Sequence, residues 1–170
     1  MPTTGKGRLV RSFDYVNQPY LRVREALMSD PTRLFRDATQ AAASRAQSLA
    51  AALTVNIAGI DVSTEISIKV GKIEDLKRQG GPATRATIEW KAARRPRLFP
   101  LMSAVLTIYP LTSTETQMEF TGRYRPPLGA IGRVINAAVG HRIAEASVHR
   151  FVADVAEHLR ESLGGRGGRG

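Results

Sequence analysis

The chain has 170 residues, of which 42% are hydrophobic and 24% charged, and its formal net charge is +10. This length and composition are typical of one globular domain and exclude a disordered or fibrous chain. The absence of cysteine excludes disulfides, thiolate metal sites and cysteine nucleophiles. Three histidines supply little for metal chemistry, and we expect no metal and no cofactor.

The two ends of the chain are expected to differ from its middle. Residues 1–6 are predicted to be a flexible N-terminus, and residues 164–170, built of glycine and arginine, a disordered tail. Residues 7–163 then form a single domain. No run approaches the roughly 18 apolar residues of a membrane span, and the first residues lack the apolar region of a signal peptide. We therefore interpret the protein as cytoplasmic.

Residues 8–16 alternate between apolar and polar side chains and predict a first strand. Leu9, Phe13 and Tyr15 fall together on one of its faces. Aromatic residues elsewhere in the chain also fall mostly at alternating positions. We interpret most aromatic residues as inward-facing, where they line a core or a cavity, and not as a platform for stacking bases.

Two helices in tandem are predicted after this strand. Asn17 offers an N-cap, and Pro19 can occupy the first turn of a short helix that ends near Met28. Asp30 and Pro31 repeat this start signal and open an alanine-rich helix with apolar residues at helical spacing.

From residue 53 the apolar period changes to two, which predicts a meander of strands. The alternating stretches are residues 53–57, 60–70, 86–92 and 116–124, and residues 102–109 form a further predicted strand. A glycine-bearing polar loop separates the second stretch from the third. Residues 102–109 are apolar on both faces, as expected for a covered central strand. Residues 128–163 return to a helical period and predict a long C-terminal helix.

This order of elements predicts an α+β fold in which an antiparallel sheet of about six strands curves around the last helix, with two short helices after the first strand. The order resembles the helix-grip fold of the START/SRPBCC superfamily, which includes pollen-allergen-like and polyketide-cyclase-like proteins. The segment 19–27, the pair Asp30–Pro31 and the segment 147–152 contribute to the resemblance, which covers residues 7–163. It implies an apolar cavity between sheet and helix, and it supplies no shared catalytic motif.

The C-terminal helix carries the candidate ligand-binding pair. If Val148 is at the centre of its core-facing side, His141 and Glu145 lie within about 20° and 60° of that centre, at about 100° per residue. Two interpretations remain open: an ion pair at the rim of the core, or a pair that orients the polar group of an otherwise apolar ligand. His149 completes a His-x3-Glu-x3-His spacing, but nothing supplies a fourth zinc ligand. The further candidates for ligand contact are Trp90, Tyr109, Met118, Phe120 and Tyr124.

Arginines concentrate at the ends of two predicted strands, and a meander would bring these ends together beside the start of the last helix. The predicted basic patch consists of Arg94, Arg95, Arg97, Arg123 and Arg125. It is either a solvated rim, a site for phosphate or carboxylate groups, or a weak contact with RNA or an anionic membrane.

Together these features predict a protein that binds or carries a small apolar or amphipathic, lipid-like ligand in a cavity of at least about 300 Å³ between the sheet and the last helix. A role without catalysis is favoured, and no specific nucleic acid is expected. Two alternatives stay open. The first is an enzyme of the cyclase or dehydratase type in which His141 and Glu145 form the acid–base pair. The second is an RNA- or ribosome-associated module that uses the basic patch and the tail.

Overall fold

The computed structural model describes residues 7–36, 66–92, 101–125 and 137–164. Several predictions from the sequence fall outside these residues: the strand at 53–57, the N-terminus 1–6, the tail beyond Gly164, and Arg94, Arg95 and Arg97.

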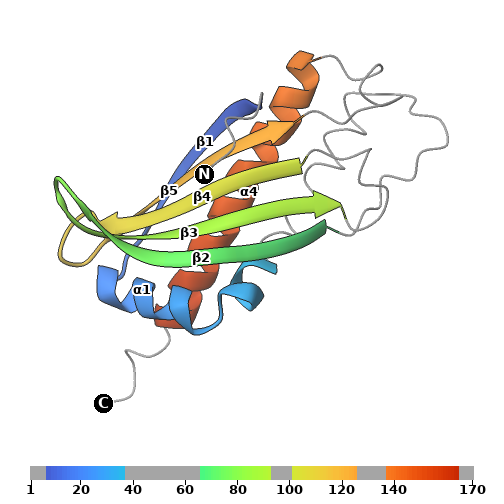
Figure 1. Cartoon of the computed structure of the whole chain (residues 1–170). Coiled ribbons are helices and arrows are strands. Elements are labelled where there is room, and N and C mark those ends of the chain that lie inside the picture. The colour runs from blue at the N-terminus through green and yellow to red at the C-terminus, as the bar shows by residue number, and fades with distance from the viewer. Residues whose placement is uncertain (1–6, 37–65, 93–100, 126–136, 165–170) are drawn as a thin grey trace.

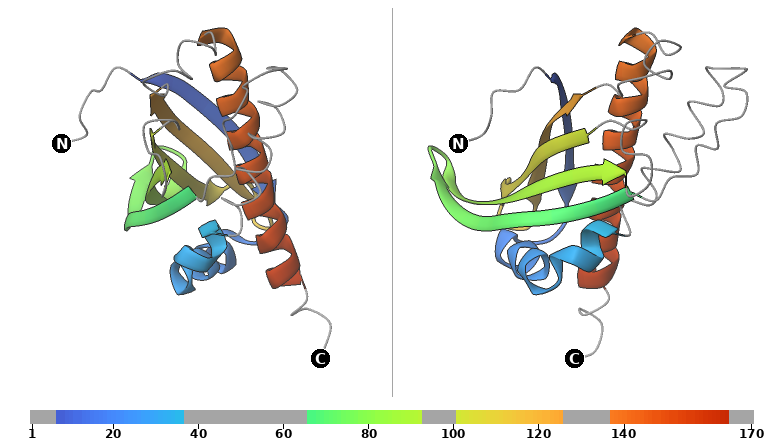
Figure 2. Two further views of the ribbon diagram at one scale, coloured as in Figure 1. Left: turned by 90° about the vertical axis from the view of Figure 1, so that its right-hand side faces the viewer. Right: turned by 45° about the vertical axis from the view of Figure 1, so that its right-hand side comes forward.

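Five strands form one antiparallel sheet in the order β1-β5-β4-β3-β2, with β1 and β2 at its edges. The curved sheet lies against the long helix α4, and α1 lies below the sheet (Figures 1 and 2). The α+β helix-grip architecture is therefore confirmed, with five described strands where about six were expected. The elements are β1 (Arg8–Val16), α1 (Tyr20–Ser29), β2 (Ile66–Arg78), β3 (Gly81–Ala92), β4 (Leu101–Pro110), β5 (Thr116–Arg125) and α4 (Ala137–Gly164).

The start of α1 differs from the prediction that Asn17 is its N-cap. Pro19 occupies the N-cap position in an extended conformation, and no side chain caps the helix. The Pro19 carbonyl accepts the first helical hydrogen bonds, and proline suits this position because no backbone N–H is needed there. The second start signal is confirmed. The chain is helical from Pro31, and the Asp30 carboxylate accepts a hydrogen bond from the Arg33 backbone N–H at 3.1 Å.

The hairpin of β2 and β3 is longer than the alternation predicted. β2 continues to Arg78, and its register against β3 shifts between Val70 and Ile73. Gly71 lies in this bulge, where a Cβ atom would collide with the Thr87 hydroxyl. The bulge explains why a strict period of two ends near residue 70 although the strand goes on.

The core lies between the inner face of the sheet and α4. The predicted inner side of α4 is confirmed, and Val148, Val152, Val155 and Leu159 are all buried. The ring of Phe151 packs 5.6 Å from that of Phe120 on β5 and 5.9 Å from that of Phe35. The interior is therefore filled by side chains where these three rings meet.

The first strand presents its larger apolar side chains to the outside. Leu9, Phe13 and Tyr15 share a face, but they are 42%, 55% and 46% exposed. Ser12 points inward instead and shares a hydrogen bond of 2.8 Å with Nδ1 of His149 on α4. The prediction that aromatic residues face inward is thus wrong for this strand. Val10, Ser12 and Val16 take its inner face, so the alternate positions, which carry the aromatic residues, face outward.

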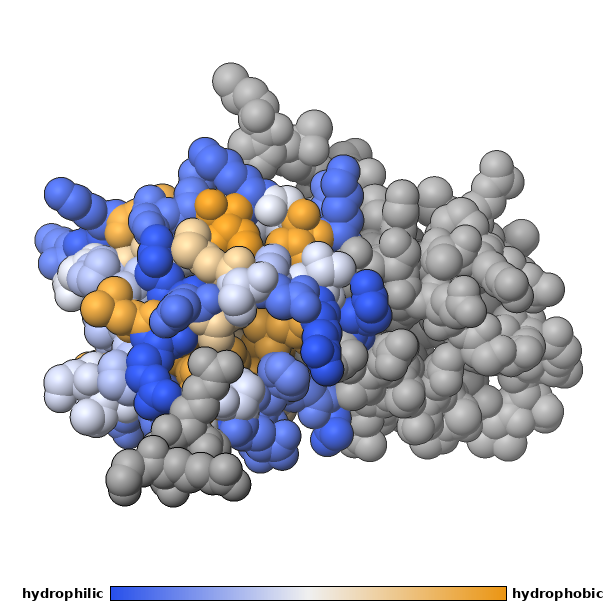
Figure 3. Space-filling model, turned by 90° about the horizontal axis from the view of Figure 1, so that it is seen from below, coloured by the Kyte–Doolittle hydropathy of each residue, from blue (hydrophilic) through white to orange (hydrophobic). Residues whose placement is uncertain are grey.

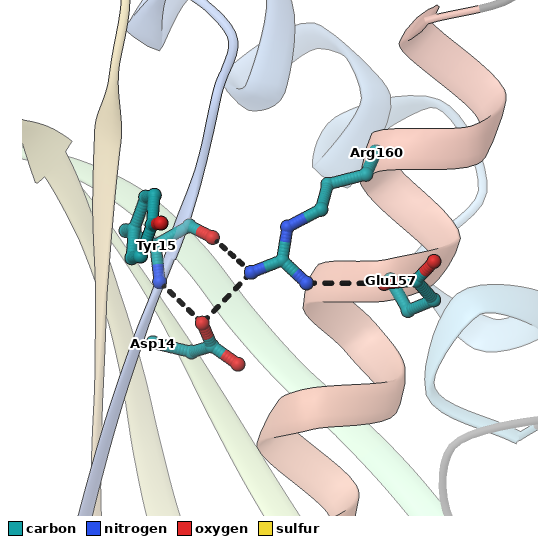
Figure 4. A network of polar contacts seen from close by, with 4 residues as sticks. All are labelled: Asp14, Tyr15, Glu157 and Arg160. Atoms are coloured by element: carbon teal, nitrogen blue, oxygen red, sulfur yellow. Dashed lines mark hydrogen bonds and ion pairs between the residues drawn. The ribbon is translucent and has the colours of Figure 1, made fainter.

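Two polar networks hold the helices to the sheet. On α4, Arg160 donates to the Asp14 carboxylate at 2.8 Å, to the Tyr15 carbonyl at 2.5 Å and to the Glu157 carboxylate at 3.1 Å (Figure 4). These contacts fix the C-terminal half of α4 beside the end of β1.

The second network ties α1 to the hairpin of β2 and β3. Arg24 donates two hydrogen bonds to Asp75, at 2.6 and 2.9 Å, and the Thr84 hydroxyl donates to the same carboxylate at 2.8 Å. Because the hydroxyl proton of Thr84 is used in this way, Tyr20 donates its own proton to Thr84 across 2.7 Å. Hydrogen bonds from Arg24 and Thr84 lower the pKa of Asp75 to about 2.

Candidate functional site

The predicted pair on α4 meets β5 at one end of the sheet. The His141 and Tyr124 rings stack with centroids 6.1 Å apart and an angle of 23° between their planes. Nε2 of His141 lies 3.1 Å from Oε1 of Glu145. The His141 side chain is 32% exposed and that of Glu145 is 49% exposed, whereas Tyr124 is buried. The pair therefore lies at the rim of the core, with an aromatic wall on its inner side.

One nitrogen of this histidine is buried and unused. Nδ1 of His141 is shielded from solvent and has no hydrogen-bond partner among the described residues. Glu145 fixes the other nitrogen as a donor, so Nδ1 of the neutral ring presents a lone pair, and of the protonated ring an N–H. A buried polar atom without a partner is costly, which makes it a natural contact for a polar group from outside the chain.

The neighbouring phenol is protonated and shielded. Burial raises the pKa of the Tyr124 hydroxyl, and a hydrogen bond and the charge of Arg8 act in the opposite direction. The register pairs Arg8 with Tyr124, which brings the guanidinium to the same end of the sheet. His141, Glu145, Tyr124 and Arg8 together form what we call the rim cluster. Its hydrogen-bonding groups and its buried aromatic wall suit contact with a single polar group.

The other residues predicted to contact a ligand lie in different places. Met118 and Phe120 are fully buried in the core. Tyr109 lies on the outer face of the sheet, where the Arg78 guanidinium sits 4.0 Å from its ring centroid, so a ligand between the sheet and α4 would not touch it. The backbone of Trp90 pairs with Met102, and its side chain lies outside the described structure.

The predicted basic patch is described only in part. Arg123 is exposed and donates to the carbonyl of Gly7 at 3.2 Å. Trp90 of β3 pairs with Met102, which in turn pairs with Tyr124 of β5, so these two strands end at the same side of the sheet. The side chain of Arg125 is not described, and the patch as a whole stays a prediction.

The third histidine of the His-x3-Glu-x3-His spacing has another role. Nδ1 of His149 is bonded to Ser12, which ties the middle of α4 to β1. Within the four described stretches, no three histidine, aspartate or glutamate side chains gather as a metal site would require.

A pocket that the sequence did not indicate lies between α1 and the last turns of α4. It has a volume of about 490 Å³, and it differs in place from the cavity expected between the sheet and α4. Figure 3 looks at this end of the molecule, where apolar surface lies among hydrophilic side chains. Its walls include Leu34 and Leu159 with Glu25, Ser29, His158 and Ser162. The only sequence signal for it is that Glu25 and Ser29 share one side of α1.

No family model matches the chain, and no curated protein matches it. Solved structures with a similar chain trace include a conserved protein from Geobacillus kaustophilus, with 11% identity, a TM-score of 0.49, and coverage of 91% of this chain and 97% of that chain. The Zhui aromatase/cyclase from Streptomyces sp. R1128 has 15% identity, a TM-score of 0.45 and coverage of 94% of both chains. A START superfamily protein from Mycobacterium smegmatis has 11% identity, a TM-score of 0.42, and coverage of 92% of this chain and 99% of that chain.

The strand order and the placement of α4 across the inner face define a helix-grip protein. This helix-grip architecture is the one that the sequence resemblance implied. Within the described parts of the chain, no helix is long and apolar enough to span a membrane.

Proposed function

We propose that this protein binds a small amphipathic molecule whose polar group contacts the rim cluster and whose apolar part lies between the sheet and α4. The observation that carries the proposal is the buried Nδ1 atom of His141, which has no partner among the described residues. The packed rings around Phe151 fill the middle of the interior, so the apolar part would lie between them and Tyr124.

The ligand group that suits this site has a hydroxyl or a carboxyl function. A hydroxyl would donate to Nδ1 of the neutral His141 ring, and a carboxylate would accept from the protonated ring. The protonated phenol of Tyr124 and the guanidinium of Arg8 can donate to the same oxygen atoms.

The test uses His141→Phe, which keeps a flat ring against Tyr124 and removes both nitrogens. The probes are a fluorescent fatty acid and its matching fatty alcohol, titrated into the full chain. We expect at least one of them to bind, and binding to weaken by about 1–3 kcal/mol, or about 5- to 160-fold, because a buried hydrogen bond is lost. The matched control is His158→Phe, the same substitution on the same helix but in the pocket beside α1.

The binding data for the three proteins decide whether the ligand contacts the rim cluster. Weaker binding in His141→Phe with unchanged binding in His158→Phe supports the proposal. Weaker binding in His158→Phe alone would place the ligand in the pocket between α1 and α4 instead. No binding of either probe by the unmodified chain, or equal binding by all three proteins, would refute the proposal.

A cyclase or dehydratase reaction is the second candidate, and the arrangement of the His141 and Glu145 pair favours it. A carboxylate on Nε2 that leaves Nδ1 for a substrate is the arrangement of an oriented general base. Glu145→Gln distinguishes the two functions. Both a binding protein and an enzyme keep their affinity for the probes in this variant. Only an enzyme has a turnover to lose, and this loss distinguishes it.

A further inference from the structure

The outer edge of β1 is one of the two edges of the described sheet. β1 pairs with β5 on one side, and no described strand pairs with it on the other. In an antiparallel strand, the N–H and C=O of one residue point to the same side, and those of the next residue to the opposite side. The backbone groups of Tyr15 bind Asp14 and Arg160 and therefore point away from β5. The alternation places those of Leu9, Arg11 and Phe13 on the same open edge.

A polar cap covers one end of this edge. The Asp14 carboxylate accepts from the Tyr15 N–H at 2.7 Å, and the Arg160 guanidinium donates to the Tyr15 carbonyl (Figure 4). Such capping is a common protection of edge strands against pairing with other chains. No hydrogen bond from a described residue reaches the backbone of Leu9, Arg11 or Phe13, so the protection stops at Tyr15.

The uncapped stretch is flanked by apolar side chains. Leu9 is 42% exposed and Phe13 is 55% exposed, on the outer face of the strand. Together with Tyr15, they are three of the six large apolar side chains that are exposed among the described residues. An extended apolar edge whose backbone donors and acceptors have no partner among the described residues is a template for the addition of a strand.

The charges beside this edge indicate which kind of segment it would bind. Arg11 is exposed between Leu9 and Phe13, and the exposed Arg123 stands opposite Leu9 on β5. The acidic side chains nearby are already paired, Asp14 with Arg160 and Glu119 with Arg78. A segment that carries an acidic residue opposite Arg11 would therefore gain a cross-strand ion pair.

A second copy of this chain fits the edge less well. Two copies of β1, paired antiparallel about a two-fold axis over residues 9–13, would place Arg11 directly opposite Arg11 of the other copy. Like charges at directly opposed positions of a sheet are destabilising. The charge of the edge thus disfavours a symmetric dimer through this strand.

We propose that the open edge at residues 9–13 binds an extended segment of a partner protein, added to the sheet as a further strand. The segment has an acidic residue opposite Arg11 and apolar residues two positions away on either side, opposite Leu9 and Phe13. This interaction is independent of the ligand proposed at the rim cluster.

The test selects from a displayed library of random nine-residue peptides against the full chain. We expect enrichment of the pattern apolar-x-acidic-x-apolar, because alternate residues of the added strand share the outer face with Leu9 and Phe13. Substitution of lysine for the acidic residue should weaken binding at least tenfold. In hydrogen exchange, the amides of residues 9, 11 and 13 should become protected when the peptide is added, while those of residues 10 and 12 are protected already.

Three variants separate this edge from other apolar surface. Phe13→Ser and Arg11→Pro should each weaken peptide binding at least tenfold, and the proline removes an N–H that β5 does not use. Arg11→Ala reports the part of the Arg11→Pro effect that is due to charge. The matched control is Leu21→Ser on α1, where a 71% exposed leucine is lost without any change to the sheet.

Three results would overturn the proposal. The first is a selection without the alternating pattern. The second is peptide binding that survives both Phe13→Ser and Arg11→Pro. The third is self-association in sedimentation experiments that Phe13→Ser abolishes, which would assign the edge to a second copy of the chain.

Discussion

Replacement of Phe151 by alanine should destabilise the protein more than any other single change on α4. The Phe151 ring is fully buried and contacts a ring of the sheet, Phe120, at 5.6 Å and a ring of the second helical segment, Phe35, at 5.9 Å. Truncation of a buried phenylalanine costs about 3–5 kcal/mol, which includes the void that it leaves. Because this ring joins three elements that cannot all collapse onto a smaller side chain, we expect a value in the upper half of that range.

The measurement is urea unfolding of the full chain followed by circular dichroism. The comparison is Phe151→Leu, which keeps most of the apolar volume and should cost less than about 2 kcal/mol. A double-mutant cycle with Phe35→Leu should show a coupling of about 0.5–1.5 kcal/mol for the stacked pair. A loss below about 1.5 kcal/mol for Phe151→Ala would refute the reasoning, since it would mean that this ring does not fill the space between the sheet and α4.

Three further outcomes are expected. The pKa of Asp75 is about 2 in the folded state and about 3.9 in an unfolded chain, so its bond with Arg24 stabilises the fold above about pH 4 and is lost as the pH falls towards 2. The difference in melting temperature between the unmodified chain and Asp75→Asn should shrink over that interval. Gly122→Ala should cost about 1–3 kcal/mol in urea unfolding, because its Cβ atom would lie 3.0 Å from a buried ring carbon and 3.1 Å from a buried sulfur. Arg160→Met should cost about 1–2 kcal/mol, because it removes the ion pair with Asp14 and leaves a strand-edge carbonyl without its donor.

The sequence predicted the order of elements because each element has its own period. Alternation marked β1, β3 and β5, a run that is apolar on both faces marked β4, and helical spacing marked α1 and the inner side of α4. The Asp30–Pro31 signal worked since a carboxylate cap acts locally, within three residues. The bulge at Gly71 interrupted the alternation of β2, so the far half of this strand was missed.

The candidate site was predictable only in its local part. His141 and Glu145 are four residues apart on one helix, so their contact follows from helical geometry. The stacking of Tyr124 on His141 depends on where α4 crosses the sheet, which no local period encodes. Tyr109 shows the same limit. It alternates correctly along β4, but it belongs to the outer face, because the inner face is taken by residues of the other parity, such as Ile108.

The orientation of β1 connects these limits to function. If the burial of apolar side chains alone decided which face of β1 turns toward α4, the strand would bury Leu9, Phe13 and Tyr15. Each buried side chain of this kind contributes about 1.5–3 kcal/mol. A shift of one residue in register would achieve this. Instead, Ser12 faces α4 and is satisfied by His149, and the larger side chains remain in solvent. The inner face of β1 packs against α4, and its outer face is also apolar. Apolar residues on both faces are typical of a strand that is covered on both sides. The proposed partner segment would place apolar side chains of its own beside Leu9 and Phe13 on this outer face.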